Sequence, residues 1–416
     1  MALALCCLEL AFPAALWANT APIPIRVLMP APFADATANL VRQYNASQQA
    51  VDVQVERGPL NTEAISDLAI SSLLLGDSPY DLLLMDVTWT PKYVAAGWLE
   101  PLEPLLGETA DAGLVAGADL GNRFNGHLWR LPLLASTGLL FWRQDLLPEP
   151  PRTTDELVSM ARSQQSQGTV RWGYVWQGRQ YEGLSCVFLE VLSGFGGHWL
   201  NPENSSQPEL DSPEALAATR WLDELIRQGI SPPSVVNMAE QDSLQSFRSG
   251  EALFMRNWPY AWNELQKPGS GVKDKVGVSL PVPAPGHAPT STQGSWGLSL
   301  LKGSSHPQQA AEVIRWFTSI EVQTALLRDS GYPPTLQAIY DNAALQQELP
   351  LLPLLKRSLA AAKLRPATPL YAQLSDLAQR RLSGIFTGAD PVDPAMAQLQ
   401  RQSQILMQAS GARSEA

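Results

Sequence analysis

Tryptophans and a few charged side chains stand at turns where a small solute could be bound. The chain holds 13 Trp, and Trp258 and Trp296 lie beside proline or glycine rather than inside an apolar run. An aromatic face can pack against the C–H face of a sugar ring, while carboxylates accept hydrogen bonds from its hydroxyls. Asp86 follows an apolar segment, and Arg365 carries a planar guanidinium that can span two neighbouring hydroxyls. Together these residue types favour recognition of a polyhydroxylated solute.

Each of these side chains also has a purely structural explanation. Asp86 could cap a helix over Thr90–Ala96, because a carboxylate readily accepts the N–H groups of a first turn. The tryptophans could fill a core, and Arg365 could form a surface ion pair. A turn beside proline is a poor place for a core residue, and the glycines that flank Trp296 let a ligand approach the backbone. The pattern therefore favours binding at Trp258 and Trp296.

The charge balance and the cysteines exclude several classes of partner and group. The net charge is −11, and an acidic surface argues against nucleic acid, whose affinity comes mainly from Lys and Arg. Cys6, Cys7 and Cys186 form no CxxC motif and the four His form no HxxxH motif, so no metal site is expected. No GxGxxG or GxxxxGK[ST] motif stands at a strand-to-helix turn, so no cofactor is expected either.

Two alternatives to a sugar-binding protein stay open at this point. A glycoside hydrolase needs two carboxylates about 5–10 Å apart across the scissile bond. Asp86 and Glu182 could supply them, but no glycosidase motif surrounds either residue, and no catalytic residue is predicted. The second alternative is a binding protein for a non-sugar solute such as a polyamine, a metal or phosphate. Arg365 would repel a cation, and clusters of His, Met or Cys for a metal are missing.

Short apolar runs alternate with amphipathic segments in the first part of the chain. Strands are predicted at Ile25–Met29, Val51–Glu56 and Asp81–Met85, and helices at Ala36–Ser47 and Glu63–Leu75. This alternation is typical of an α/β fold with a parallel-rich sheet. Ligands of such sheets collect at the carboxyl ends of the strands. The turns there carry Phe33–Asp35 and Asp86–Trp89, and a small-molecule site is expected beside them.

A second α/β unit follows in the middle of the chain. Strands are predicted at Arg171–Trp176 and Glu251–Met255, helices at Pro213–Gln228, Gln241–Arg248 and Pro307–Leu327, and a Pro-rich loop at Pro281–Thr292. The helix that starts at Pro213 has the clearest boundary, because Ser212 can cap it and Glu214 stands near its positive end. Two further amphipathic helices are predicted near the C-terminus.

The N-terminus has the features of an export signal. An apolar run is followed by Leu16-Trp17-Ala18, a suitable cleavage context, although no basic residue precedes the run. We expect residues 1–24 to be a signal segment and the mature chain to begin between Ala18 and Ile25. A lipid anchor at Cys6 is less favoured, because Leu5 and not a small residue precedes it. No later segment reaches the roughly 20 apolar residues of a membrane span.

Several segments, in order along the chain, resemble the family 1 extracellular solute-binding proteins of sugar ABC importers. They are Tyr80–Trp89, Ala95–Leu102, Gly138–Arg143, Gly173–Gly178, Gln180–Leu184, Ser249–Ala252, Arg256–Tyr260, Gly294–Gly297 and Arg365-Pro366 with Tyr371. The likeness is greatest to the trehalose/maltose-binding and glucosylglycerol-binding branch. It implies a periplasmic, monomeric protein that binds a glucoside such as glucosylglycerol (a compatible solute), trehalose, sucrose or maltose and delivers it to a membrane permease.

The resemblance also implies a two-lobed, maltose-binding-protein-like fold with a ligand cleft between the lobes. Lobe 1 would comprise residues 25–136 and 297–333, and lobe 2 residues 137–296 and 334–416. The chain would cross between them three times, near Ser136, Trp296–Leu300 and Pro333–Thr335. Hinge closure on a ligand is a known behaviour of periplasmic binding proteins and a standard example of domain closure.

The resemblance implies a set of ligand-binding residues. Asp86 would bind hydroxyls, Trp258 would be a stacking platform, and Arg365 would complete the polar contacts. The other members are Tyr181, Glu182, Tyr260, Gly294, Trp296 and Tyr371, with Phe33, Asp35, Asn61 and Thr62 at the first two strand-to-helix turns. Relatives carry an aromatic residue and an aspartate at the first crossing, where this chain has Leu134-Ala135-Ser136-Thr137. This departure puts the identity of the sugar in question.

Overall fold

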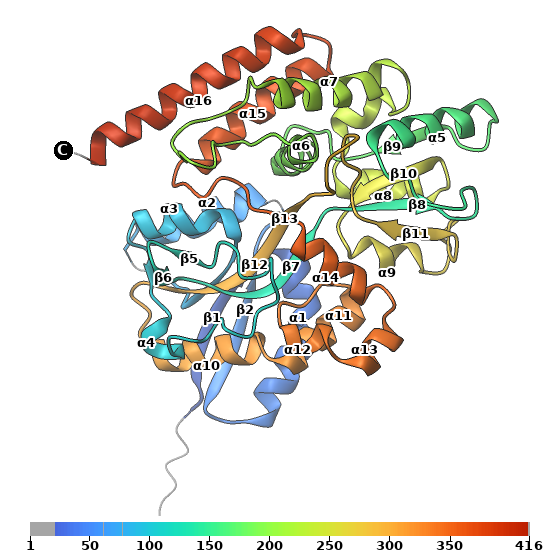
Figure 1. The fold of residues 1–416 in the computed structure, drawn as a ribbon. Helices are drawn as coiled ribbons and strands as arrows, with labels where there is room; N and C mark the ends of the chain where they lie inside the picture. The colour runs from blue at the N-terminus through green and yellow to red at the C-terminus, as the bar shows by residue number, and fades with distance from the viewer. Residues whose placement is uncertain (1–20, 61, 77, 415–416) are drawn as a thin grey trace, which may run out of the picture.

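The computed structural model describes residues 21–60, 62–76 and 78–414. Residues 1–20, which hold Cys6, Cys7 and most of the predicted signal segment, lie outside the described residues, as does Asn61. Within the described part, two large sheets occupy separate halves of the molecule and helices flank both (Figure 1). None of the helices described there is both long and apolar enough to span a bilayer.

The first sheet is organised around an apolar strand. Every residue of β3 (Leu82–Asp86) is buried, because this Leu-Leu-Leu-Met run has neighbours on both edges and both faces. It pairs in parallel with β1 (Ile23–Met29) and in antiparallel fashion with β12 (Ser291–Leu301). The other strands are β2 (Val51–Arg57), β4 (Leu99–Glu100), β7 (Leu131–Thr137) and β13 (Ala362–Lys363).

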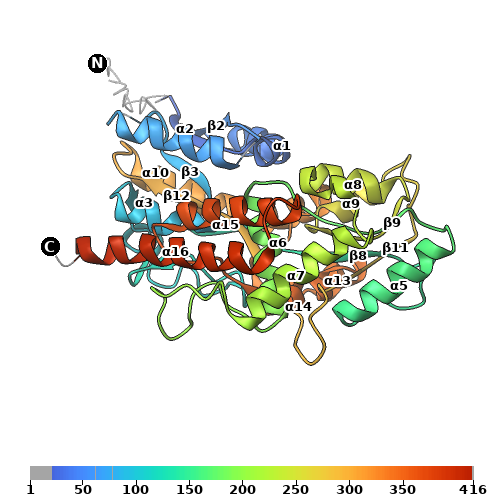
Figure 2. The ribbon, with the colours of Figure 1, turned by 90° about the horizontal axis from the view of Figure 1, so that it is seen from above.

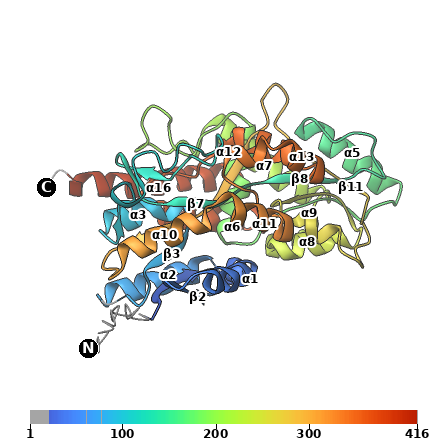
Figure 3. The same cartoon turned by 90° about the horizontal axis from the view of Figure 1, so that it is seen from below.

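Helices and a short hairpin complete this half. They are α1 (Ala31–Ser47), α2 (Thr62–Leu74), η1 (Val87–Trp89), α3 (Thr90–Ala95), α4 (Glu103–Leu106), β5 (Arg123–Phe124), β6 (His127–Leu128), α10 (Pro307–Phe317) and α11 (Ile320–Ser330). α1 and α2 line one side of the molecule when it is seen from above (Figure 2). α10 and α11 follow one another on the lower face (Figure 3).

The second sheet has the strand order β11-β8-β10-β9. Its strands are β8 (Leu139–Arg143), β9 (Trp172–Val175), β10 (Ala252–Asn257) and β11 (Val276–Ser279), and its helices are α5 (Thr154–Ser166), α6 (Glu182–Gly194), α7 (Pro213–Arg227), η2 (Pro233–Asn237), α8 (Glu240–Arg248) and α9 (Ala261–Leu265). α7 begins where the sequence predicts, since the Ser212 side chain accepts a hydrogen bond from the N–H of Ala215.

The C-terminal segment contacts both sheets. It forms α12 (Gln337–Tyr340), α13 (Ala343–Glu348), α14 (Leu352–Ala360), α15 (Tyr371–Phe386) and α16 (Val392–Ser414). α14 packs on β7 of the first sheet, whereas α15 packs on α6 and α7 of the second half. The loop between α14 and α15, which contains Arg365, therefore passes between the two halves.

The α/β class is confirmed, but the sheets are mixed rather than parallel-rich. β1 runs parallel to β2 and β3, and β9 runs parallel to β10, as the alternation predicts. β12 runs antiparallel to β3, β4 and β7, and β8 runs antiparallel to β10 and β11. Local periodicity does not reveal the direction of strands that arrive from distant parts of the chain.

The course of β12 differs from the predicted crossing. Residues 291–296, assigned to lobe 2 from the sequence, pair with β13, β7 and β3 in the first sheet, and the strand continues through Trp296–Leu300. The Pro-rich loop accordingly ends before Ser291 instead of at Thr292. The lobe boundaries as a whole, including the other two crossings, stay a prediction.

Two helices also differ from the predicted bounds. α1 begins at Ala31 and not at Ala36, because Pro32 lies in its first turn, where the missing N–H costs nothing, and Pro30 is the N-cap residue. The single helix predicted over Pro307–Leu327 is divided into α10 and α11. Ser319 caps the second of these by accepting a hydrogen bond from Val322, a signal present in the sequence.

Candidate solute-binding site

Four aromatic rings gather where the strands of the first sheet end. Trp296 lies 5.1 Å from Phe33 and 5.5 Å from Trp89, measured between ring centroids, and Phe33 lies 5.2 Å from Tyr332. All four side chains are half-buried. The rings meet at tilted or edge-on angles, the arrangement that their quadrupoles favour. This part of the site therefore offers apolar ring surface that no neighbour fully covers.

Trp258 stands on the second sheet and is held from one side. The guanidinium of Arg256 lies over its ring at 4.1 Å from the centroid, and the indole N–H donates to Glu240 Oε1 at 3.2 Å. Arg256 is buried and fixed by an ion pair with Glu190. One face of the ring is thus supported by a buried cation, while the residue as a whole stays half-buried.

Gly294 connects Trp258 to the aromatic cluster of the first sheet. A Cβ at position 294 would lie 3.1 Å from the Trp258 ring, so a larger residue would crowd the indole. Gly294 and Trp296 are two positions apart on β12 and therefore face the same side of the sheet. Trp258 and Trp296, predicted from the sequence as binding residues, are thus brought to the same face of one strand.

The carboxylate that accepts from the Trp258 indole also acts on two phenols. Glu240 is the first residue of α8. Burial raises the pKa of Tyr181 and of Tyr260 above the usual tyrosine value, and the negative charge of Glu240 adds to this shift. Both phenols therefore keep their protons at neutral pH and can donate. The guanidinium of Arg179 lies 4.5 Å from the centroid of the Tyr181 ring.

Three of these side chains were missed from the sequence. Trp89 lies three residues after Asp86 in a segment already singled out, and the position of the turn could have indicated it. Tyr332 directly precedes the predicted third crossing. Glu240 carried no local signal, because only the packing of α8 against β10 brings it to Trp258.

The predicted charged residues form a separate, buried network. Arg365 donates from Nη2 to both carboxylate oxygens of Asp86 at 3.0 and 3.2 Å, and from Nη1 to Glu182 Oε1 at 2.6 Å. Asp86 also caps η1, since its Oδ1 accepts from the backbone and the hydroxyl of Thr88. Asp86 is therefore a helix cap, but not of the helix expected over Thr90–Ala96, because the N-cap position of α3 is occupied by Trp89.

Glu182 is the centre of the network on the side of the second sheet. Besides Arg365 it accepts from the hydroxyls of Tyr371 and Ser375, so both of its oxygens have internal donors. Burial raises the pKa of Glu182, and Arg365 opposes the shift. The network joins β3, the N-terminus of α6 and the C-terminal segment, and most of its hydrogen-bonding capacity is used by its own members.

The remaining residues predicted from the sequence belong neither to the aromatic cluster nor to the Arg365 network. Asp35 is exposed and forms a two-point ion pair with Arg57 at 2.8 and 3.0 Å. Asn61 lies outside the described residues, and Thr62 begins α2. At the predicted first crossing, the hydroxyl of Thr137 donates to Ser358 and is not free for a ligand.

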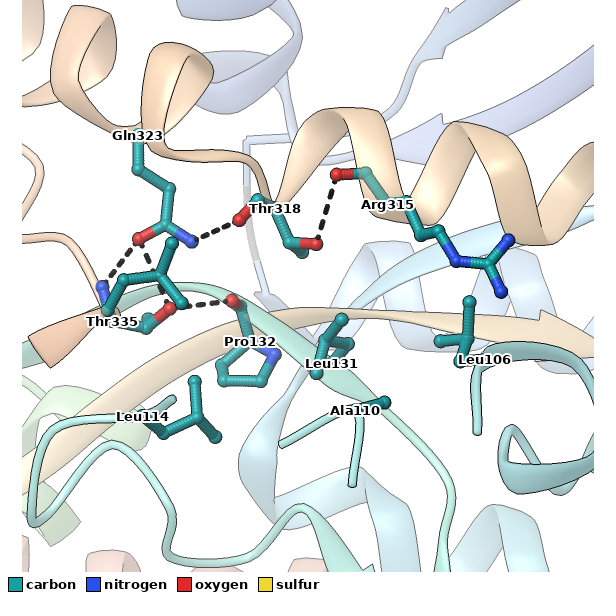
Figure 4. Close-up of a pocket in the computed structure, with 10 residues that line it drawn as sticks. Leu106, Ala110, Leu114, Leu131, Pro132, Arg315, Thr318, Gln323 and Thr335 are labelled. Atoms are coloured by element: carbon teal, nitrogen blue, oxygen red, sulfur yellow. Dashed lines mark hydrogen bonds between the residues drawn. The ribbon is translucent and has the colours of Figure 1, made fainter. Parts of the chain in front are cut away.

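A cavity of about 210 Å³ lies away from all of these residues (Figure 4). Its walls come from the segment around α4, the start of β7, α10 and α11. Its polar side chains are already paired: Gln323 donates to Thr318 and accepts from Thr335, which in turn donates to Pro132. The cavity therefore presents few free polar groups and is not the candidate site.

The chemistry of the described residues contains no obvious metal centre. No group of three or more His, Cys, Asp or Glu side chains in the described part could hold a metal ion. Cys186 is buried in α6, and burial raises the pKa of its thiol to about 12. Such a buried, protonated thiol is chemically inert.

Comparison with known proteins gives this arrangement a family. A profile described as bacterial extracellular solute-binding protein matches residues 30–324. The chain belongs to this family. A probable ABC transporter-binding protein of Deinococcus radiodurans is 30% identical over 354 residues, which cover 82% of this chain and 83% of that protein. The trehalose/glucosylglycerol branch is not distinguished by these matches.

Two further relatives of this solute-binding protein carry the name of a ligand. A maltotriose-binding protein of Pyrococcus abyssi is 24% identical and covers 85% of this chain and 73% of its own. The structure of maltose-bound MalE3 of T. maritima is 30% identical, with a TM-score of 0.85 over 92% of this chain and all of that one. The two-lobed MalE-like fold is thereby confirmed.

Proposed function

We propose that this chain is the extracytoplasmic solute-binding subunit of an ABC importer and that it binds a sugar, more narrowly a glucoside. The observation that carries the proposal is the placement of Trp258 and Trp296, both half-buried, on one face of β12. Exposed aromatic ring surface beside polar side chains matches a sugar, which has apolar C–H faces and hydroxyl edges. The maltose- and maltotriose-binding relatives support the same class of solute.

The proposed mechanism is capture by closure of two lobes. The first sheet contributes Trp296, Phe33 and Trp89, and the second contributes Trp258, Tyr181 and Tyr260. A solute held between the two sets would bridge the halves and favour the closed form, because it contacts both only there. Closure would then present the loaded protein to the membrane permease.

We assign Asp86, Arg365 and Glu182 a positioning role. The guanidinium of Arg365 is shared by both carboxylates, and the loop that contains it passes between β3 and α6. A carboxylate pair that shares one guanidinium is also a poor fit to a glycosidase, whose two carboxyl groups face the scissile bond from opposite sides. The proposed protein is therefore not an enzyme.

Calorimetry on the purified chain tests this function. Maltose, trehalose, sucrose, glucosylglycerol and mannitol are titrated in turn, and tryptophan fluorescence is recorded in parallel. We expect one site per chain for at least one glucoside and a change in fluorescence. A ligand at about 100 times its Kd should also stabilise the folded protein by about 2.7 kcal/mol in a thermal-shift assay. The absence of any response at millimolar concentration would refute the sugar-binding function.

Export is part of the same proposal. Mass spectrometry of native material should find a monomeric mature chain that starts between Ala18 and Ile25 in the periplasm. A chain that keeps Met1 and stays in the cytoplasm would contradict the role in an importer.

A further inference from the structure

A buried ion pair lies behind the Trp258 ring. Arg256 is 1% exposed and Glu190 is 3% exposed. The guanidinium is held through three nitrogens, because Nε and Nη2 donate to Glu190 at 3.3 and 3.2 Å and Nη1 donates to Gln177 Oε1 at 3.1 Å. The same guanidinium lies 4.1 Å from the centroid of the Trp258 ring. The group on which the indole rests therefore cannot shift without breaking buried hydrogen bonds.

The ion pair also contacts the junction between the two sheets. Gly138 is the single residue between β7 of the first sheet and β8 of the second. A Cβ at position 138 would lie 1.9 Å from Glu190 Oε2 and 2.4 Å from Arg256 Nη2, so any larger residue would displace the pair. Ser291 Oγ, at the start of β12, lies 2.7 Å from the carbonyl oxygen of Gly138 and 3.3 Å from Glu190 Oε2. The pair is thus packed where two strands of the first sheet meet the second half.

Stability alone does not explain why these charges are buried. Taking two ions out of water is costly, and apolar residues of similar volume often replace a buried ion pair with no loss of stability. The pair does have a particular place, however. It lies between the Trp258 indole and the junction at Gly138, which are the stacking surface and a connection between the two halves.

We infer that Arg256 and Glu190 are positioning residues that fix the Trp258 ring relative to the junction of the two sheets. This inference rests on the proposed function and adds to it how the stacking surface is kept in place. The solute contacts Trp258 and not the ion pair, so the pair affects sugar affinity only through the indole. A change at Gly138 reaches the solute through the same two side chains.

Two substitutions test the pair from opposite sides. Arg256→Lys keeps a cation beside Glu190, but one ammonium group cannot replace the planar guanidinium and its three bonded nitrogens. The affinity for maltose, trehalose or sucrose, whichever the wild type binds, should fall about three- to tenfold in calorimetry. Gly138→Ala displaces the pair from the side of the junction and should also weaken binding.

A double-mutant cycle with Trp258→Ala separates positioning from a general structural role. If the pair acts through the indole, neither Arg256→Lys nor Gly138→Ala reduces the affinity further once residue 258 is alanine. Arg143→Met is the matched control, because it removes another ion pair of the second half, in which Nε and Nη2 each donate to Asp145 at 2.7 Å. It should lower the melting temperature and leave the affinity unchanged.

The outcomes distinguish the two proposals. If the wild type binds a sugar and both variants bind it equally well, or lose as much affinity with Trp258→Ala as without it, the inference is wrong while the function stands. If the wild type binds none of these sugars, the function fails and the inference with it. If Arg256→Lys does not fold, Arg256→Met combined with Glu190→Met takes its place, since it removes both buried charges together, and the same loss of affinity is expected.

Discussion

Two neighbouring groups of polar residues use their hydrogen bonds in opposite ways. In the network of Arg365, Asp86 and Glu182, both carboxylates are occupied by internal donors. Around Trp258, by contrast, one hydrogen bond to Glu240 and the guanidinium of Arg256 hold the indole, and the side chain stays half-buried. A sequence shows the residue types but not whether their hydrogen-bond donors and acceptors already have partners within the protein. Here that difference separates residues that stabilise the fold from residues that can bind a solute.

The physical reason lies in the cost of burying charge. Asp86 and Arg365 are almost fully buried, and an ion in that environment is tolerated only if a counter-ion and further hydrogen bonds compensate it. Aromatic rings need no counter-ion, so Trp258 and Trp296 can stay half-buried at little cost in free energy. The four predictions that follow test this division, from the largest expected effect to the smallest.

Arg365→Met should have the largest effect, and it should be on stability. The substitution leaves Asp86 and Glu182 as buried carboxylates without their shared cation, which costs about 3–5 kcal/mol. Urea denaturation monitored by circular dichroism measures it. A variant as stable as the wild type that no longer binds sugar would show that Arg365 is a ligand residue and not a structural one.

Trp258→Ala should act mainly on affinity. The variant loses a stacking face worth about 0.5–1.5 kcal/mol beyond its area burial, so several glucosides should weaken together by about tenfold or more. The far-ultraviolet dichroism should stay native, because the indole is half-buried and not part of a core. Unfolding of this variant, or unchanged affinity for every sugar, would place Trp258 outside the site.

Phe33→Leu should have a smaller effect on both quantities. Phe33 contacts Trp296 and Tyr332, and aromatic pairs of this kind contribute about 0.5–1.5 kcal/mol each. We expect a modest loss of stability in urea and an affinity reduced only a few-fold in calorimetry. A loss as large as that of Trp258→Ala would mean that the first sheet and not the second supplies the main stacking surface.

Arg57→Met should have the smallest effect. Its ion pair with Asp35 is more than half exposed and is screened by solvent, so neither the urea midpoint nor sugar affinity should change measurably. A clear loss of sugar affinity would show that Asp35 belongs to the binding site, although its exposed ion pair with Arg57 indicates that it does not.

The sequence predicted most of the fold near the site and part of the site itself. The apolar run of β3 and the Ser-Pro-Glu start of α7 were sufficient to locate these elements, since both signals are local. The direction and length of β12 could not be derived, because they depend on pairing with β3, β4 and β7 from other parts of the chain.

The same limit applies to individual side chains. Trp258 follows the end of β10 as expected, whereas Trp296 lies inside β12 and not at a turn; the binding role of both stays a prediction. The pairing of Asp86 with Arg365 spans 279 positions of sequence, and that of Arg365 with Glu182 spans 183. No spacing rule covers such separations, so residues expected to face a ligand are found to face one another.

A crystal structure of the chain with the tightest-binding sugar tests the central division most directly. The account predicts a sugar ring against Trp258 and Trp296 and an unbroken contact of about 3.0 Å between Arg365 Nη2 and Asp86 Oδ1. A sugar hydroxyl inserted between Asp86 and Arg365, with neither indole against the sugar, would contradict it.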